Sequence, residues 1–182
     1  MDATSQPGPH RRMIRQRRKV IYLLGFMGSG KSTVGKLLAT ALGWPLIDLD
    51  TVIEAGQGLT IKEIFENSGE PFFRQVEHAA LTASSQAEPA VIALGGGTFA
   101  QSANVDLIRE SGGVTVWLDC PPEILRARCE GMEHRPLFRD EQAFTQLFME
   151  RVAYYRLADY RISTEGRKPE EVVEQILSLR VF

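Results

Sequence analysis

The chain has 182 residues, of which 43% are hydrophobic and 24% charged, and its 21 basic and 23 acidic side chains give a formal net charge of −2. These values are ordinary for a globular domain and argue against wholesale disorder and against a general nucleic-acid binder. No apolar run approaches the roughly 18–20 residues of a membrane helix, and two cysteines are too few for a disulfide scaffold, so we expect a cytoplasmic protein without a membrane segment.

The first 19 residues form a compositionally distinct segment. Six of the 21 basic residues stand in it against one acid, Asp2, and it is rich in Pro, Gly and Arg. It lacks the apolar centre of a secretory signal, and the first predicted strand begins too soon to leave room for a separate transit peptide. We expect residues 1–19 to be a disordered tail, with nonspecific contact to anions as the alternative, and residues 20–182 to form one domain.

Short apolar runs alternate with helical patterns through the rest of the chain. The apolar runs predict strands at 20–24, 46–49, 90–94, 114–119 and 160–163. Helical spacing covers 31–42, 72–84, 102–111, 141–157 and 169–179. Pro121 and Pro122 open another helix that ends near residue 130, and Thr60 with Glu63 forms a capping box at a further helix start. The alternation is typical of a mainly parallel sheet covered on both faces.

A glycine-rich loop follows the first predicted strand. Residues 25–32 (GFMGSGKS) match the pattern G-x-x-x-x-G-K-[ST] between a strand and a helix. Such a loop aims backbone N–H groups at phosphates, Lys31 can reach the β- and γ-phosphates, and the Ser32 hydroxyl can bind Mg²⁺. A plain strand-to-helix turn is disfavoured because spacing, context and the Lys-Ser pair agree. The loop therefore predicts that ATP or GTP binds.

Two carboxylates stand where the second predicted strand ends. If the chain is still extended there, Asp48 and Asp50 face the same way, at the sheet edge where ligands bind. One carboxylate could serve Mg²⁺ while the other orients a substrate hydroxyl or accepts its proton. Helix capping or a turn is the alternative. The strand at 90–94 ends in glycine rather than in a metal-binding acid, which favours a small-molecule kinase over a motor ATPase.

Three further features have two interpretations each. The triplet at 95–97 is either a tight loop with unusual dihedral angles or bare backbone that approaches a ligand. Arg74 and Glu77 are either an exposed ion pair of little consequence or a guanidinium fixed for a substrate carboxylate. The polar segment 131–140 predicts a mobile flap. The arginines around the flap either stabilise charge on the γ-phosphate or are simply solvated; they are Arg128, Arg135, Arg139 and Arg151.

The combined motifs resemble the shikimate kinases over nearly all of residues 20–182. They are GFMGSGKST at 25–33, DLD at 48–50, FRQVE at 73–77 with LGGG at 94–97, and HRPLF at 134–138 followed by RVAYY at 151–155. The resemblance implies a three-layer α/β P-loop kinase fold with a five-stranded parallel sheet in the order 2-3-1-4-5 and a mobile lid at about 131–140. It also implies transfer of the γ-phosphoryl group of ATP to the 3-hydroxyl of shikimate, in the route to chorismate and the aromatic amino acids.

The same resemblance assigns roles to individual residues. The catalytic residues would be Lys31, Asp50 and Arg135. The nucleotide would contact Gly28, Ser29, Gly30, Lys31, Ser32, Thr33, Arg128, Arg135 and Arg167, and Mg²⁺ would contact Ser32 and Asp48. Shikimate would contact Asp50, Phe65, Phe73, Arg74, Gly95, Gly96, Gly97 and Arg151, with Glu77 orienting Arg74. We expect a monomer whose partners are shikimate and ATP.

Two rival functions remain at this point. A gluconate kinase would share the phosphate loop and the lid, although the FRxxE and GGG motifs disfavour it. A nucleotide-binding switch that has lost catalysis would be expected to lack at least one of the catalytic side chains, and all of them are present.

Overall fold

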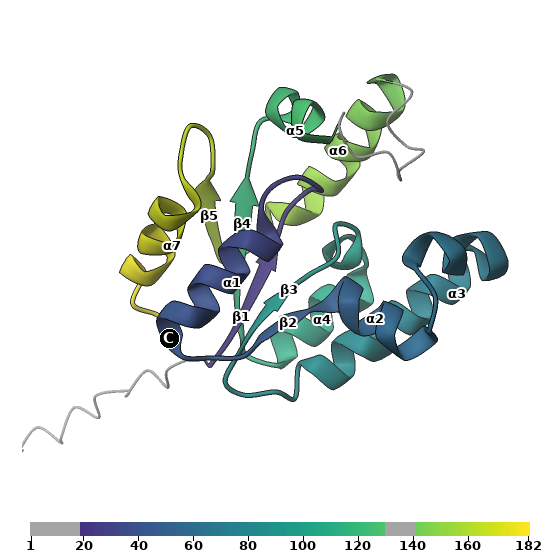
Figure 1. Cartoon of the computed structure of the whole chain (residues 1–182), viewed down its shortest axis with the longest axis horizontal. Coiled ribbons are helices and arrows are strands. Elements are labelled where there is room, and N and C mark those ends of the chain that lie inside the picture. Colours follow the sequence, from purple (N-terminus) through teal and green to yellow (C-terminus); the bar gives the residue numbers. More distant parts are fainter. Residues whose placement is uncertain (1–18, 130–140) are drawn as a thin grey trace, which may run out of the picture.

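The computed structural model describes residues 19–129 and 141–182, and shows a five-stranded sheet with helices on both sides (Figure 1). The strands are β1 (Val20–Leu24), β2 (Leu46–Asp48), β3 (Ala90–Ala93), β4 (Val114–Asp119) and β5 (Tyr160–Ser163). Their order is β2-β3-β1-β4-β5 and every pair is parallel, which confirms the predicted fold class. Within the described ranges, none of the helices is both long and apolar enough to cross a bilayer.

The helices lie between or beyond these strands in chain order. They are α1 (Lys31–Leu42), α2 (Leu49–Gln57), α3 (Ile61–Ser84), α4 (Ser102–Glu110), α5 (Pro122–Cys129), α6 (Glu141–Tyr155) and α7 (Pro169–Ser178), with a short 3₁₀ helix η1 (Thr98–Ala100). Most predicted ends lie within two residues of the observed ones. The predicted flap and nearly all of the predicted tail fall outside the described residues.

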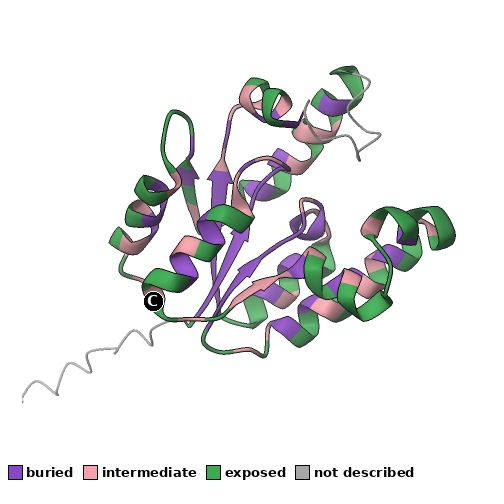
Figure 2. Ribbon diagram, in the orientation of Figure 1, coloured by how far each residue is buried: buried purple, intermediate pink, exposed green. Residues whose placement is uncertain are grey.

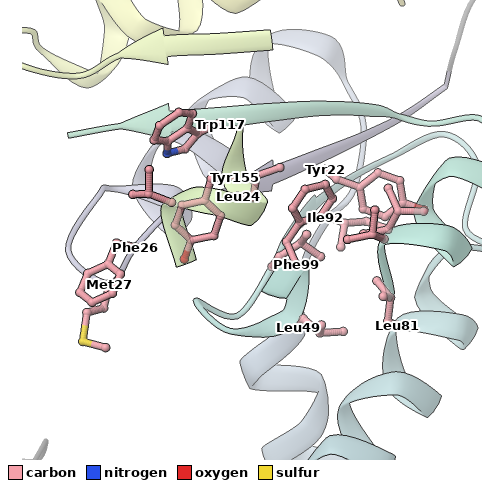
Figure 3. Packing of buried hydrophobic residues seen from close by; sticks show 14 of the residues in the cluster. Tyr22, Leu24, Phe26, Met27, Leu49, Leu81, Ile92, Phe99, Trp117 and Tyr155 are labelled. Atoms are coloured by element: carbon pink, nitrogen blue, oxygen red, sulfur yellow. The ribbon is translucent and has the colours of Figure 1, made fainter. Parts of the chain in front are cut away.

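The central strand β1 separates two apolar layers. Because successive side chains of a strand point to opposite faces, Ile21 and Leu23 pack with α1 and α7, whereas Tyr22 and Leu24 pack with the helices of the other side. Figure 2 shows the three inner strands β1, β3 and β4 almost wholly buried and the outer helix faces exposed. Figure 3 shows Tyr22 and Leu24 with other members of their layer. Burial on both faces explains why these strands read as continuous apolar runs.

Helix α1 is fixed to the sheet so that its first turn faces the carboxyl ends of the strands. It starts after Gly30 (φ 93°) and ends at Gly43, whose φ of 67° is the left-handed conformation that favours glycine. Leu38 is fully buried against the sheet. At Gly35 a Cβ atom would lie 3.0 Å from Leu46 Cδ1, so the absent side chain lets the helix approach the sheet closely.

The region between β2 and β3 differs from the prediction. Strand β2 ends at Asp48, one residue early, and helix α2 starts at once and was not predicted. Asp48 stands at its N-cap position, as the capping alternative would have it, but makes no capping hydrogen bond and accepts one from Ser32 instead. Leu49 and Ile53, four residues apart, form the buried side of this helix.

Helix α3 joins two helical segments that the sequence suggested separately. Its capping box is confirmed, with Thr60 N–H donating to Glu63 Oε2 (2.8 Å) and Glu63 N–H donating to Thr60 Oγ1 (3.2 Å). Gly69 interrupts the helix with φ 75° and ψ 174°. The break redirects the chain, so that residues of both segments meet beside the site described below.

The close approach of Gly113 to Tyr22 gives a test of the packing. A Cβ atom at Gly113 would lie 2.4 Å from Tyr22 Cε2, and Tyr22 is fully buried. We expect Gly113→Ala to lower the free energy of unfolding by about 1–3 kcal/mol through overpacking, measured by urea denaturation.

The matched control is Gly56→Ala on the exposed side of α2. No described atom lies within 4 Å of the added Cβ there. This change should raise the free energy of unfolding by about 0.5–1 kcal/mol, because alanine is the better helix former. A similar change of stability in both variants would contradict the packing argument.

Candidate active site

A cavity of about 590 Å³ lies at the carboxyl ends of the parallel strands. This size falls within the range of small-molecule sites, and the position is where open parallel sheets bind ligands. It brings together predicted residues from five separate segments: Gly28, Ser29, Gly30, Lys31, Ser32, Thr33, Asp48, Asp50, Gly96, Arg128 and Arg167. The phosphate loop, the end of β2 and Gly96 of the glycine triplet therefore face one space. The other predicted substrate residues are not among those that line it: Phe65, Phe73, Arg74, Gly95, Gly97 and Arg151.

The phosphate loop presents positive charge and backbone donors to this cavity. Lys31 Nζ donates to the carbonyl oxygens of Gly25 (2.9 Å) and Phe26 (3.1 Å), so the ammonium group is held over the loop. The first turn of α1 contains no acidic residue, and its N-terminal N–H groups carry the positive end of the helix dipole. The arrangement suits a polyphosphate anion.

Ser29 adds an unusual hydroxyl to the same loop. Its side chain is 2% exposed, and within the described residues its Oγ is the one buried side-chain polar atom that lacks a hydrogen-bond partner. Buried hydroxyls are nearly always hydrogen-bonded, so a buried hydroxyl without a partner in a cavity indicates that a ligand atom pairs with it. A phosphate oxygen in the loop would supply one.

Ser32 and Asp48 place two oxygen atoms side by side at the cavity wall. Ser32 Oγ donates to Asp48 Oδ2 over 2.8 Å. A hydroxyl and a single carboxylate fit Mg²⁺, because this ion usually keeps several water ligands and takes others from substrate phosphates. Within ranges 19–129 and 141–182 there is no group of three or more His, Cys, Asp and Glu side chains that could hold a metal. A metal at this place would therefore depend on the nucleotide for much of its coordination.

Asp50 reaches the cavity by a different route from the one expected. The chain is no longer extended there, because Asp50 lies in the first turn of α2. The geometric reason given for pairing Asp48 with Asp50 is thus wrong, although both residues line the same cavity. The tight turn from β2 into α2 brings them together.

The glycine triplet is the surface against which three charged side chains converge. A Cβ at Gly95 would lie 2.7 Å from Asp50 Oδ1, and one at Gly96 would lie 3.0 Å from Arg151 Nη1. At Gly97 it would lie 2.9 Å from Arg74 Nη1. None of the three glycines has a positive φ. Close approach, rather than unusual dihedral angles, therefore explains the triplet.

Arg74 is held by carboxylates on two sides. Its Nη1 donates to Glu77 Oε2 (2.8 Å), and its Nε and Nη2 donate to Glu70 Oε1 (3.1 and 2.9 Å). Burial works to lower the pKa of Arg74, but the hydrogen bonds and charge of Glu77 and Glu70 outweigh it and raise the pKa. Glu77 is only 1% exposed. The pair is therefore a buried structural element and not a solvated ion pair.

Arg151 brings a second guanidinium from α6. Burial, and secondarily repulsion from Arg74, lowers its pKa, although Tyr155 opposes this. Its Cζ lies 5.3 Å from the centre of the Phe26 ring, and the Tyr155 hydroxyl donates to Gly96 O. Burial raises the pKa of Tyr155, so the phenol stays protonated. Two neighbouring, partly buried guanidinium groups form a second anion site beside the phosphate loop.

Two predicted aromatic residues lie next to Arg74. The rings of Phe65 and Phe73 have centroids 4.5 Å apart and come from opposite sides of the break at Gly69. Arg74 Cζ lies 5.2 Å from the centre of the Phe73 ring. Phe73 is buried in the core, whereas Phe65 is partly exposed, at 36%. Phe65 thus has more surface left for a ligand.

The remaining predicted arginines divide into two groups. Arg128 Nη1 donates to Gly28 O (3.0 Å) and so joins α5 to the phosphate loop, and Arg167 lines the cavity from the segment after β5. Arg135 and Arg139 lie outside the described residues. Sequence reasoning missed several residues that line the cavity, because small and apolar side chains carry no distinctive chemistry: Met27, Val34, Ala93, Leu94, Thr164, Pro169 and Val172.

Comparison with known proteins gives concordant matches. The family model for shikimate kinase matches residues 27–180. A shikimate kinase of Persephonella marina is 45% identical over 158 residues, covering 86% of this chain and 96% of that protein. The crystal structure of shikimate kinase from Aquifex aeolicus superposes with a TM-score of 0.81 at 42% identity, over 88% of this chain and 96% of that one. Shikimate kinase from Acinetobacter baumannii in complex with shikimate gives a TM-score of 0.84 at 36% identity, over 90% and 93%.

The burial of Glu77 gives a test of the Arg74 pair. Glu77→Gln keeps the shape of the side chain and removes the charge that Arg74 faces. Because the change removes the buried partner of Arg74 and leaves only the exposed Glu70, we expect a loss of about 1–3 kcal/mol in the free energy of unfolding, measured by urea denaturation.

Glu66→Gln on the same helix is the control. Glu66 pairs with Lys62 at 3.7 Å, and both side chains are more than half exposed. Its loss should stay below about 1 kcal/mol. Equal losses in the two variants would show that burial does not decide the strength of these pairs.

Proposed function

The chain belongs to the shikimate kinase family and is an ATP-dependent kinase, and on this premise we propose how its residues phosphorylate the 3-hydroxyl of shikimate, in the synthesis of aromatic compounds. The observation that carries the proposal is a pair of anion sites that meet at the glycine triplet, where Gly96 lines the cavity of the phosphate loop and also lies against Arg151. The phosphate loop forms one of them, and the guanidinium groups beside the glycine triplet form the other.

On the acceptor side, the residues match the chemistry of shikimate, which is a carboxylate with three hydroxyl groups. We assign the carboxylate to Arg74 and Arg151, because guanidinium groups bind carboxylates with two parallel hydrogen bonds. Asp50 and the Gly95–Gly97 backbone lie where they would contact hydroxyl groups. Phe65 and Phe73 would pack against the ring.

On the nucleotide side, the loop and Lys31 would hold the phosphates. Ser32 Oγ and Asp48 Oδ2 would hold Mg²⁺, which supplies neutralising positive charge to the phosphates when it is bound. Arg128 and Arg167 would border the adenine ring from the far end of the cavity. The remaining contacts would come from Gly28, Ser29, Gly30 and Thr33.

In the proposed reaction, Asp50 accepts the proton of the 3-hydroxyl while that oxygen attacks the γ-phosphorus. The bond between the γ-phosphorus and the bridging oxygen breaks, and ADP leaves. Lys31 and the loop N–H groups stabilise the charge on the transferring group, and we assign the same task to Arg135. Positioning and charge stabilisation do most of this work, because phosphoryl transfer needs little covalent chemistry from the protein.

Several broader proposals accompany this assignment. We expect the protein to act in the cytoplasm as a monomer on small molecules, without nucleic acid or a membrane. The near-zero net charge supports the absence of nucleic acid. We also propose that residues 1–19 are dispensable for the reaction and that residues 131–140 form the lid.

A coupled assay of ADP release tests the proposed reaction. With ATP and Mg²⁺ present, we expect release to depend on added shikimate and to stay at background with gluconate or with no acceptor. Release without an acceptor would indicate an ATPase or a switch protein. Release with gluconate alone would indicate the rival kinase, and either result contradicts the proposal.

The base role of Asp50 is tested by Asp50→Asn. The amide keeps the shape of the side chain but cannot accept the proton, so we expect kcat to fall by roughly 10²–10⁴-fold. ATP binding, followed by calorimetry, should change little, because the phosphates are held by Lys31 and the loop. If kcat stays near the wild-type value, Asp50 is not the base.

A further inference from the structure

The two carboxylate oxygens of Glu77 have different partners. Oε2 accepts from Arg74, and Oε1 accepts from the Thr98 hydroxyl over 2.7 Å. Glu77 is 1% exposed and Thr98 is fully buried. A carboxylate this deep keeps its charge and its orientation only when its oxygens are hydrogen-bonded. Thr98 therefore holds one of the two carboxylate oxygens of Glu77, and Arg74 holds the other.

Thr98 is itself held in place by its surroundings. Its N–H donates to Gly95 O (3.2 Å), and its carbonyl accepts from Asn104 Nδ2 (3.0 Å). Asn104 is buried, and its Oδ1 lies 2.7 Å from His78 Nδ1 on α3. The hydroxyl is therefore aimed by an ordered network that joins η1 and α4 to α3.

The same hydroxyl lies against the glycine triplet. A Cβ at Gly95 would lie 2.9 Å from Thr98 Oγ1 and 2.7 Å from Asp50 Oδ1. Thr98 is fully buried, whereas the Arg74 side chain keeps 22% of its surface exposed. Any effect of Thr98 on a bound molecule must therefore pass through its neighbours.

We propose that Thr98 is a positioning residue for recognition of the shikimate carboxylate: its hydroxyl fixes Glu77, which in turn fixes the guanidinium of Arg74. This inference rests on the proposed function and adds to it a residue that does not touch the substrate. Without the hydroxyl, Glu77 Oε1 loses its donor, so the carboxylate gains freedom to turn and Arg74 loses a fixed partner.

Thr98→Val tests this directly, because valine has nearly the same shape and lacks the hydroxyl. We expect the KM for shikimate to rise by about 10- to 100-fold, the range that follows from losing a hydrogen bond to a charged group. The KM for ATP should stay within about twofold of wild type, because the hydrogen bonds described for Thr98 and Glu77 join them to each other and to residues outside the phosphate loop, among them Gly95, Asn104 and Arg74. Thr98→Ser restores the hydroxyl and should return the KM for shikimate toward the wild-type value.

Thr115→Val is the matched control. Thr115 is also buried, and its hydroxyl donates to a carboxylate, Asp159 Oδ2, over 2.9 Å. This pair lies at the start of β4, at the opposite end of the sheet from the active-site cavity. The change should lower the stability of the protein and leave both KM values unaltered.

A second substrate separates carboxylate positioning from a general disturbance. An analogue of shikimate in which the carboxylate is reduced to a primary alcohol gives Arg74 no anion to bind. The ratio of kcat/KM between wild type and Thr98→Val should therefore be much smaller for the alcohol than for shikimate. Equal ratios would overturn the proposal.

Other outcomes also decide the question. A KM for shikimate in Thr98→Val that matches Thr115→Val would overturn the proposal, as would a failure of Thr98→Ser to recover or a parallel rise in the KM for ATP. A wild-type protein that leaves shikimate unphosphorylated would contradict the proposed function, and this inference with it. An active wild type with an unaffected Thr98→Val contradicts the inference alone.

Discussion

The buried carboxylate of Glu77 is the constraint on which the acceptor side of the molecule depends. It lies inside the protein with a guanidinium on one oxygen and a hydroxyl on the other, and these come from α3 and η1. A charge in such a place is tolerated only when its partners are fixed. The requirement ties α3 to the loop that follows β3, and so sets the position of the glycine triplet relative to Arg74.

The parallel sheet brings this acceptor side next to the phosphate loop. Strands β1 and β3 are neighbours, with Leu23 paired to Ala93, and each is followed by a glycine-rich segment at the same edge. Phe26 of the phosphate loop contacts Arg151 and also packs edge-on against Phe144 and Phe148 of α6. The two anion sites therefore share a wall, as transfer between two bound molecules requires.

Local patterns in the sequence were sufficient to predict the strands, the phosphate loop and the start of α3 at Thr60. Each of these is defined by residues close together in the chain. The sheet order came from the family resemblance, since periodicity does not reveal which strands are neighbours. Helix α2 was missed because Asp48 and Asp50 were interpreted as ligand-binding residues of an extended strand, whereas Asp48 stands at the N-cap of the helix.

Burial and long-range contact explain the other gaps between sequence and structure. The spacing of Arg74 and Glu77 is the same for an exposed pair and for a buried one, so only the fold could decide between them. The contact of Glu77 with Thr98, 21 residues away, leaves no local pattern at all. Sequence reasoning found the candidate site residues that belong to a distinctive motif or carry a charge. It did not find the apolar residues that line the cavity, because they carry no distinctive chemistry.

The bare backbone of the glycine triplet has a consequence for inhibitor resistance. Every single substitution at these three positions adds at least a Cβ atom, and that atom would lie within about 3 Å of Asp50, Arg151 or Arg74. A compound that binds the main chain of residues 95–97 would thus contact an element that the protein cannot alter without displacing the side chains to which we assign the substrate. Escape by mutation would have to arise elsewhere in the cavity.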